Sequence, residues 1–323
     1  MQLDSGSEKK KRAQGSPKGD SDIVHAAVTD VGMERSVNED RCALISTIHG
    51  ACHLVLDGMG GVEGGEFAAQ LSVDAVQRCL LGQHMEPAEA IRHAFEDANR
   101  TIMLRRQNRK FSEMGTTIVG IIIEGSSVAI AHVGDSRAYL VSGEEIHQVT
   151  VDHTYVQQLV DRNEISKEEA LPHPQSHILT QCLGSSPDLR VDVKQYWIWP
   201  LEKGEATDFI VLCTDGLYSM VAEEEIFSLV SSLQPRESCE ELVKLANARG
   251  GFDNITVSVI PLNGHLRDVV SPTRGKEVKT RERAMKAAQW WRRSILFHLV
   301  LAAVGGFFAA AIAVVAFMYW NVF

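Results

Sequence analysis

The residues of this chain that could do chemistry are acidic side chains placed where apolar runs begin or stop. Short pairs of Asp with Gly, Asn or Glu recur at these places: Asp57-Gly58, Gly134-Asp135, Asp215-Gly216, Asp253-Asn254 and Glu39-Asp40. A single corner of this kind can be an ordinary turn, because Asp and Gly are frequent turn residues. Their repetition in one stretch of chain predicts that sheets bring several carboxylates to one edge.

Carboxylates held close together repel one another unless cations lie among them. The corners contain no Cys or His, and an all-oxygen ligand set favours hard ions such as Mg²⁺ or Mn²⁺ over zinc or copper. Two such ions about 3.5–4 Å apart can activate water and stabilise an in-line displacement at phosphorus. The acidic corners therefore predict a two-metal centre that hydrolyses phosphate esters.

Hydrophobic patterning indicates the elements that must position these corners. Strands are expected at 24–29, 43–48, 51–56, 116–123, 128–133, 138–141, 145–149, 191–199, 209–214 and 255–260. Helices are expected at 66–81, 87–109, 154–162, 166–170, 216–232 and 235–249. The helix at 166–170 begins with Ser166 and has Glu169 three residues on, which is a capping box. Because the strands come in hairpin groups, the pattern predicts an α+β domain with antiparallel sheets and helices packed outside.

The charge distribution limits the classes of function. The 323-residue chain has a formal net charge of −10, and residues 23–263 hold 18 Lys and Arg against 35 Asp and Glu, a net −17. Binding of nucleic acid needs clustered basic side chains, so no nucleic-acid partner is expected and a body that collects cations is favoured. The six cysteines lack CxxC spacing, which favours buried, reduced thiols over a zinc site.

The C-terminal end has the pattern of a membrane span. Residues 295–317 are apolar except for His298, and a helix of this length covers about 35 Å against a bilayer core of roughly 30 Å. A buried core helix is the alternative, although such helices are rarely apolar on all sides for this length. Aromatic residues flank the run, no charged residue follows it, and five basic residues precede it: Arg281, Arg283, Lys286, Arg292 and Arg293. The positive-inside rule then places residues 1–294 in the cytoplasm, at the inner membrane.

These observations divide the chain into five parts. Residues 1–22 are expected to be a disordered polar tail, 23–262 a folded body, 263–294 a basic juxtamembrane linker, 295–317 one transmembrane helix and 318–323 a short extracytoplasmic end. The basic run at 9–12 is either a solvated segment of the tail or a contact for anionic lipid. The expected protein is a single-pass one with its body in the cytoplasm.

Taken in order, the motifs resemble those of the metal-dependent Ser/Thr protein phosphatases of the 2C class. The matching strings are Arg35-Ser-Val-Asn-Glu-Asp40, Asp57-Gly-Met-Gly-Gly61, Gly115-Thr-Thr117, Gly134-Asp-Ser-Arg137, Thr214-Asp-Gly216 and Asp253-Asn254. Two further segments, Asp152-His-Thr154 and 173–184, are similar to the bacterial branch that opposes eukaryotic-like Ser/Thr kinases. The resemblance covers about residues 24–262, nearly the whole body.

The resemblance implies a β-sandwich of two antiparallel sheets flanked by helix pairs, with metals in a cleft at one edge. It implies that Asp57 bridges two Mn²⁺ or Mg²⁺ ions, that Gly58 offers its carbonyl oxygen, and that Asp215 and Asp253 complete the cluster. Arg35 would clamp the substrate phosphate, a task that suits the bidentate fork of a guanidinium.

The resemblance also implies an outer set of site residues. Glu39 and Asp40 would act on the metals partly through bound water, and Asp135 would help to hold a third, weaker metal. Asn254 and Thr117 match supporting positions.

The chain departs from many eukaryotic members at Met59, where those proteins carry a His proposed as the general acid for the leaving group. A thioether cannot donate a proton, so the acid would be a metal-bound water, or the leaving group would depend on metal polarisation. His153 is a further candidate, and its alternative role is a structural hydrogen bond in a flap. Ser136 and Arg137 either assist the site or only shape the turn after Asp135.

The expected activity is hydrolysis of phosphoserine and phosphothreonine on cytoplasmic proteins by a metal-activated water. The expected partners are phosphorylated proteins, a cognate Ser/Thr kinase and the membrane. One alternative is a non-catalytic phosphoprotein-binding scaffold, which loss of Asp57, Asp215 or Asp253 would favour, and all three are present. The other is a small-molecule phosphatase, which would show a closed pocket instead of an open acidic cleft.

Overall fold

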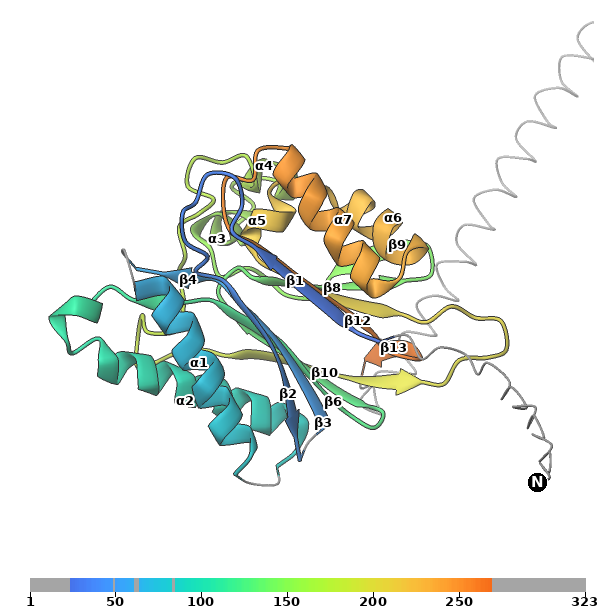
Figure 1. Cartoon of the computed structure of the whole chain (residues 1–323), viewed down its shortest axis with the longest axis horizontal. Coiled ribbons are helices and arrows are strands. Elements are labelled where there is room, and N and C mark those ends of the chain that lie inside the picture. The colour runs from blue at the N-terminus through green and yellow to red at the C-terminus, as the bar shows by residue number, and fades with distance from the viewer. Residues whose placement is uncertain (1–23, 49, 61–63, 83–84, 269–323) are drawn as a thin grey trace, which may run out of the picture. The chain divides into compact units, whose positions relative to one another are not determined.

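The computed structural model describes residues 24–48, 50–60, 64–82 and 85–268 (Figure 1). The expected tail at 1–22, the expected membrane span at 295–317 and the end at 318–323 lie outside the described residues, as does most of the expected linker. Within the described ranges, no helix is both long enough and apolar enough to cross a membrane.

Two antiparallel sheets form the centre of the fold. The first is ordered β1-β12-β11-β8-β9, and its strands are β1 (Ala26–Asp30), β12 (Ile255–Pro261), β11 (Phe209–Cys213), β8 (Arg137–Ser142) and β9 (Glu145–Gln148). The second is ordered β13-β10-β7-β6-β3-β2, and its strands are β13 (His265–Asp268), β10 (Asp192–Trp199), β7 (Ser127–Val133), β6 (Ile118–Glu124), β3 (Gly50–Leu56) and β2 (Arg41–Thr47). A short ribbon pairs β4 (Gly58–Met59) with β5 (Gly115–Thr116).

Helices cover the outer faces of both sheets. The six-stranded sheet packs against α1 (Gly64–Leu80) and α2 (Pro87–Arg105), and the five-stranded sheet against α6 (Glu223–Ser232) and α7 (Pro235–Ala248). Figure 1 shows these two pairs on opposite sides of the sheets. The remaining helices are short: η1 (Arg109–Phe111), α3 (Tyr155–Asp161), α4 (Lys167–Ala170) and α5 (Asp215–Tyr218). The expected α-β-β-α sandwich is confirmed.

Strand alternation builds the three apolar layers between these elements. In β3, Leu54 and Leu56 face α1 and α2, while Val55 between them packs into the layer between the two sheets. The third layer lies between the five-stranded sheet and its helices, with Val257 and Leu242 among its members. Because the central strands are buried on both faces, their sequences are nearly continuous apolar runs.

Local sequence signals set the helix starts. At α4, Ser166 Oγ accepts from the Glu169 N–H at 3.3 Å, and Glu169 Oε2 accepts from the Ser166 N–H at 2.8 Å. The expected capping box is therefore confirmed. The helix expected at 216–232 is instead two helices, α5 and α6, because Glu225 Oε2 accepts from the Ala222 N–H at 3.1 Å and starts a new helix there.

The folded body extends further than the sequence indicated. The linker was expected to begin at 263, but β13 pairs with β10 and places Leu266 opposite Ile198. Leu266 is buried and joins the layer between the sheets. The expected boundary at 262 is therefore wrong by six residues, because one apolar side chain in a charged segment suffices to seat a short edge strand.

Candidate active site

The acidic corners meet at one end of the sandwich. In the six-stranded sheet, Leu56 opposes Arg41, which brings the end of β3 beside the start of β2. In the five-stranded sheet, Cys213 opposes both Arg137 and Val257, which brings the end of β11 beside the starts of β8 and β12. Loops from both sheets border a cleft of about 540 Å³ at this end.

Most of the expected site residues line this cleft. They are Arg35, Glu39, Asp57, Gly58, Thr117, Asp135, Asp215, Asp253 and Asn254. Met59 also lines it, as the position after the Asp-Gly pair requires. Two expected residues are not among the lining residues: Asp40 is buried, and His153 is bonded to the turn before Asp135.

Threonine groups fix the corner at Asp57. The Asp57 N–H donates to Thr117 Oγ1 at 3.1 Å, and the Asp57 carbonyl accepts from the Thr117 N–H at 2.9 Å and from Thr116 Oγ1 at 2.8 Å. The next residue must be glycine, because a Cβ on Gly58 would lie 2.6 Å from the Glu39 carbonyl oxygen. Hydrogen bonds to its N–H and to its carbonyl therefore fix the backbone of Asp57, and Asp57 itself lines the cleft.

Asn254 ties the opposite wall together. Its Oδ1 accepts from the Glu39 N–H at 2.8 Å, and its Nδ2 donates to two carbonyls of the loop before β2. Its own N–H donates to Asp253 Oδ1 at 2.8 Å. Asp215, the first residue of α5, has a buried Oδ1 without a hydrogen-bond partner in the described structure. Such an orphaned oxygen fits a ligand that the protein itself does not supply.

Asp40 is buried, with only 1% of its surface exposed. Its Oδ2 accepts hydrogen bonds from Thr214 Oγ1 at 2.9 Å and from Thr256 Oγ1 at 2.7 Å. Burial raises the pKa of Asp40 to about 7, although the two hydroxyls favour the charged form. Thr256 lies in β12, and Thr214 directly follows its partner strand β11. Thr214 belongs to one of the matching motifs, but sequence reasoning gave neither threonine a contact with Asp40.

Burial also raises the pKa of Asp57, Asp135 and Asp215, and neighbouring carboxylates raise each of them further. A cluster of this kind is unfavourable when charged unless positive charge lies within it. The unpartnered Oδ1 of Asp215 and the backbone carbonyl of Gly58, a residue without a side chain, are oxygen ligands of the type that hard cations prefer. The residues therefore fit Mg²⁺ or Mn²⁺.

Arg35 lies at the rim of the cleft. Its Nη2 donates to Asp253 Oδ2 at 2.8 Å, and its side chain remains 51% exposed. The contact holds the guanidinium beside the cluster while its other N–H groups remain available to an anion. Binding of the substrate phosphate by Arg35 stays a prediction.

Replacing Arg35 with Ala should raise KM and lower kcat/KM for a phosphothreonine peptide about 10- to 150-fold, because a charge-assisted bidentate contact contributes roughly 1.5–3 kcal/mol. The Mn²⁺ concentration that gives half-maximal activity should change little. Steady-state kinetics test this, with Arg100→Ala as the matched control, because Arg100 is an exposed arginine paired with Asp97 on α2. An unchanged kcat/KM in Arg35→Ala would place Arg35 outside the phosphate site.

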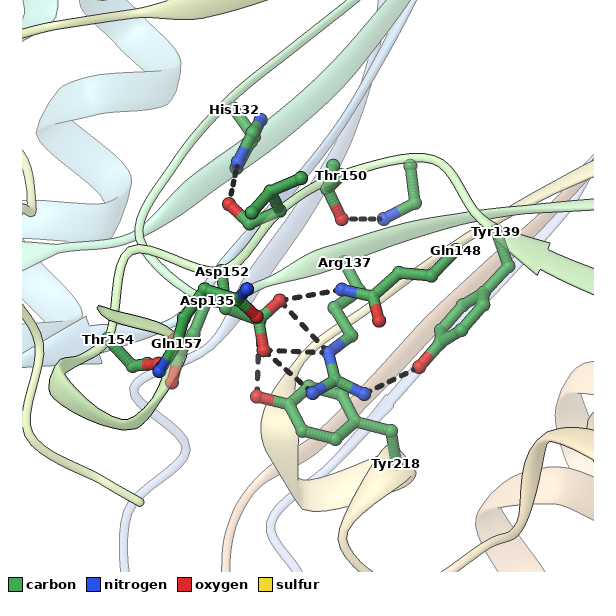
Figure 2. Close-up of polar contacts among 12 residues, drawn as sticks. His132, Asp135, Arg137, Tyr139, Gln148, Thr150, Asp152, Thr154, Gln157 and Tyr218 are labelled. Carbon is green, nitrogen blue, oxygen red and sulfur yellow. Dashed lines mark hydrogen bonds and ion pairs between the residues drawn. The ribbon is translucent and has the colours of Figure 1, made fainter. Parts of the chain in front are cut away.

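A buried ion pair supports the turn that carries Asp135 (Figure 2). Arg137 donates to both carboxylate oxygens of Asp152, with Nη2 at 2.7 Å from Oδ2, and both side chains are largely buried. The guanidinium stacks on the ring of Tyr218, 3.6 Å from its centroid, and the Tyr218 hydroxyl donates to the Asp135 carbonyl at 3.1 Å. Gln148 donates to Asp152 as well. Arg137 therefore joins the turn after β7 to α5, which begins with Asp215.

Replacing Asp152 with Asn should destabilise the fold, because it leaves the buried Arg137 without its counter-charge. Breaking a buried pair in this way costs about 3–5 kcal/mol. For a domain of this size, that lowers Tm by on the order of 10 °C. Thermal unfolding checks it against Glu225→Gln, which breaks the exposed pair with Arg249 and should have a much smaller effect. Equal shifts in the two variants would contradict the importance of the buried pair.

His153 holds the same turn from the other side. The ring Nδ1 of His153 accepts from the Gly134 N–H at 3.2 Å, and the backbone N–H of His153 donates to the Gly134 carbonyl at 3.0 Å. A neutral ring that accepts at Nδ1 carries its proton on Nε2, which lies 3.4 Å from Asp192 Oδ2. His132, His153 and Asp192 are close enough to one another to surround a metal ion. The proton on His153 Nε2, however, occupies the position through which that ring would bind the ion. The contacts favour the structural hydrogen bond over the role of general acid.

The segment 154–180 leaves the sandwich after His153 and returns at Thr180, whose N–H donates to the His153 carbonyl at 2.8 Å. Its helices are α3 and α4, and two of its side chains, His177 and Leu179, line the cleft. The sequence analysis included His177 in the segment 173–184 that is similar to the bacterial branch, without a role in the site. A His in this segment gives no periodic signal that would place it at a cleft.

An α-β-β-α sandwich with buried carboxylates that fit hard cations, and with an arginine at the rim, defines a metal-dependent phosphohydrolase. A model of the protein phosphatase 2C family matches residues 33–248. The chain therefore belongs to the protein phosphatase 2C family, and it is a metal-dependent protein Ser/Thr phosphatase.

Relatives with this fold and activity are similar over most of their length. The chain is 34% identical over 242 residues to protein phosphatase PhpP of Streptococcus pneumoniae, covering 73% of this chain and 96% of that protein. The solved structure of the serine/threonine phosphatase PstP/Ppp of Mycobacterium tuberculosis is 32% identical, with a TM-score of 0.65 over 75% of this chain and 98% of that one. A structure of the PstP catalytic domain in complex with two manganese ions is 30% identical, with a TM-score of 0.63 over 76% and 98%.

Proposed function

We propose that this phosphatase is anchored in the inner membrane by residues 295–317 and removes phosphate from serine and threonine of cytoplasmic proteins, in opposition to a Ser/Thr kinase. The observation that carries the chemistry is the set of buried carboxylates gathered at one cleft. The names of the relatives, which are Ser/Thr phosphatases, support the substrate class.

Asp57, Asp215 and Asp253, with the Gly58 carbonyl, are the residues that would hold two Mn²⁺ or Mg²⁺ ions, and Asp135 would serve a third, weaker site. When bound, such ions polarise the phosphoryl group and lower the pKa of water. Manganese in the related PstP structure supports this ion type.

The protein's own groups position the substrate and the ligands. Arg35 would receive two phosphate oxygens at the rim, where it is held by Asp253. Asn254 keeps the backbone of Glu39 against the same wall, and Thr117 fixes the Asp57 backbone from the other sheet. Asp40 would support the cluster from its buried position as a carboxylate fixed by two hydroxyls.

The shape of the rim supports a protein substrate over a small molecule. The side chains of Arg35 and Asp253 are 51% and 38% exposed, so a phosphate on an extended loop can reach them from solvent. A closed pocket, which a small-molecule phosphatase would be expected to have, would bury both. The non-catalytic scaffold is disfavoured, because all three central carboxylates are present and meet in the cleft.

Removing residues 295–323 tests the anchor. Turnover of p-nitrophenyl phosphate should be unchanged, because the cleft lies wholly within the described body, whereas dephosphorylation of a membrane-bound phosphoprotein should fall as its effective concentration is lost. Fusing an unrelated single transmembrane helix to the truncated chain should restore dephosphorylation of the membrane-bound substrate. Equal activity of the truncated and full chains on the membrane-bound substrate would refute the tether.

Protease added to intact spheroplasts tests the orientation. Residues 1–294 should be protected, because the basic residues that precede the span hold that side in the cytoplasm. Digestion of the body from outside would overturn the proposed orientation and, with it, the cytoplasmic substrates.

A further inference from the structure

Two tryptophans are exposed on one face of β10. Trp197 and Trp199 are 47% and 55% exposed, and their two-residue spacing puts them on the same side of the sheet. Tyr196 and Ile198 point the other way, into the layer between the sheets. In the neighbouring strand β13, Arg267 pairs opposite Trp197, and its guanidinium lies 5.3 Å from the Trp199 ring centroid. We call Trp197, Trp199 and Arg267 the tryptophan face.

Single exposed apolar residues are common and need no explanation. Two neighbouring tryptophans with a cation beside them form a different surface, because each ring offers a broad apolar area and an N–H that needs a polar partner. The region between lipid headgroups and acyl chains satisfies both needs at once, which is why Trp is enriched there. A guanidinium next to the rings suits the phosphates of the same layer.

The tryptophan face lies where the described chain ends. Arg267 is followed by Asp268, the last described residue, and Figure 1 shows β13 beside β10 at the edge of the sheet. Only residues 269–294 separate this point from the expected span, a distance of at most about 90 Å when fully extended. A tether of this length keeps the tryptophan face at a high effective concentration near the bilayer.

We propose that the tryptophan face docks onto the lipid headgroup layer of the membrane that holds the anchor. The proposal rests on the proposed anchoring by residues 295–317. The neighbouring exposed charges are mixed, with Lys203 against Glu202, Glu205 and Asp268. Attraction to anionic lipid is therefore weak, and the two indole rings supply most of the contact. Docking should consequently occur on zwitterionic lipid and respond little to salt.

The five tryptophans of the chain allow a direct test. Replacing Trp290, Trp291 and Trp320 with Phe leaves Trp197 and Trp199 as the only fluorescent indoles. The full-length variant is reconstituted into phosphatidylcholine vesicles whose acyl chains carry bromine close to the headgroup. Bromolipid should quench the emission strongly, and acrylamide in the water should quench it less than in the detergent-solubilised protein.

A matched control places one tryptophan at the other end of the sandwich. Phe252 is 52% exposed and adjoins Asp253 at the cleft, so Phe252→Trp in a chain with all five tryptophans changed to Phe should respond to acrylamide and not to bromolipid. A second test replaces Trp197 and Trp199 with Ser in the otherwise natural chain. That variant should still float with vesicles, and added protease should cut its linker faster.

The outcomes separate the two proposals. If the chain fails to float with vesicles, the anchor is refuted and the docking proposal falls with it. If the chain floats but bromolipid leaves Trp197 and Trp199 unquenched, the docking proposal alone is overturned. Protection from acrylamide without bromolipid quenching would show that a protein surface, such as a second copy of the chain, covers the rings instead of lipid, and would equally overturn the docking proposal.

Discussion

Replacing Asp215 with Asn should lower kcat on a phosphothreonine peptide by more than about a hundredfold, since even residues that only support metal ligands cost 10- to 100-fold when mutated. The buried Oδ1 of Asp215 has no hydrogen-bond partner in the described structure, so this atom is available to a metal and not committed to the fold. The Asn side chain keeps the shape of Asp but removes the charge that a hard cation requires.

The same substitution should stabilise the metal-free protein. Burial and the neighbouring Asp253 raise the pKa of Asp215, which means that its charged form is disfavoured in the folded state. Removing that charge relieves the repulsion, so Tm in EDTA should rise while activity falls. Asp74→Asn, on the exposed side of α1, is the matched control and should change neither. A catalytically competent Asp215→Asn variant would remove Asp215 from the metal site.

Removing divalent metal should abolish hydrolysis, and adding Mn²⁺ should restore it. The cleft supplies carboxylates that fit hard cations and an arginine that suits a phosphate, and its lining residues include no cysteine. EDTA titration with back-addition of Mn²⁺, followed on a phosphothreonine peptide, measures the effect. Full activity in excess EDTA would contradict the metal-dependent mechanism.

Thiol alkylation is the companion control for metal removal. None of the six cysteines is among the residues that line the cleft, and burial raises the pKa of the Cys52, Cys213 and Cys239 thiols to about 12. Such thiols are weak nucleophiles at neutral pH. Iodoacetamide should therefore leave turnover intact, whereas inactivation of the folded enzyme would indicate a cysteine in the reaction.

Metal should also stabilise the fold, and more strongly at higher pH. The raised pKa values of Asp57, Asp135, Asp215 and Asp40, the last at about 7, mean that the metal-free folded state holds more protons than the unfolded state between about pH 4 and 7. Stability of the metal-free protein therefore falls as pH rises through this window. The increase in Tm caused by Mn²⁺ should be larger at pH 8 than at pH 5, and an increase independent of pH would contradict the linkage.

The corners of the site were predictable because each is a local signal. Asp57, Asp215 and Asp253 each adjoin a strand that is apolar over several residues, and hairpin pairing brings such strand ends to one side. Sequence patterning also predicted the layers, since strands buried on both faces stand out as continuous apolar runs. The antiparallel sheets, the helices outside them and the carboxylates at one edge therefore followed from patterns a few residues long, whereas the two-sheet sandwich and its metal cleft were implied by the family resemblance.

The partners that join distant segments could not be predicted in this way. Thr214 and Thr256 bond to Asp40 across 174 and 216 positions of sequence, and a buried threonine in a strand or directly after one gives no signal of its partner. The pairing of Arg137 with Asp152 likewise depends on how the chain after β9 returns beside β8. The strand β13 was missed because its short sequence, HLRD, has a single large apolar residue.

Residues 154–180 follow His153 and end at Thr180, whose N–H donates to the His153 carbonyl at 2.8 Å. Because the two ends of this segment are joined at the sandwich, changes of sequence or length within it disturb the sandwich little. Each doubling of its length costs only about 0.6 kcal/mol of closure entropy. Its sequence can therefore drift, shorten or grow while the carboxylates keep their places. In evolution, such an insert would let this enzyme and its relatives inherit one chemistry and acquire different phosphoproteins to act upon.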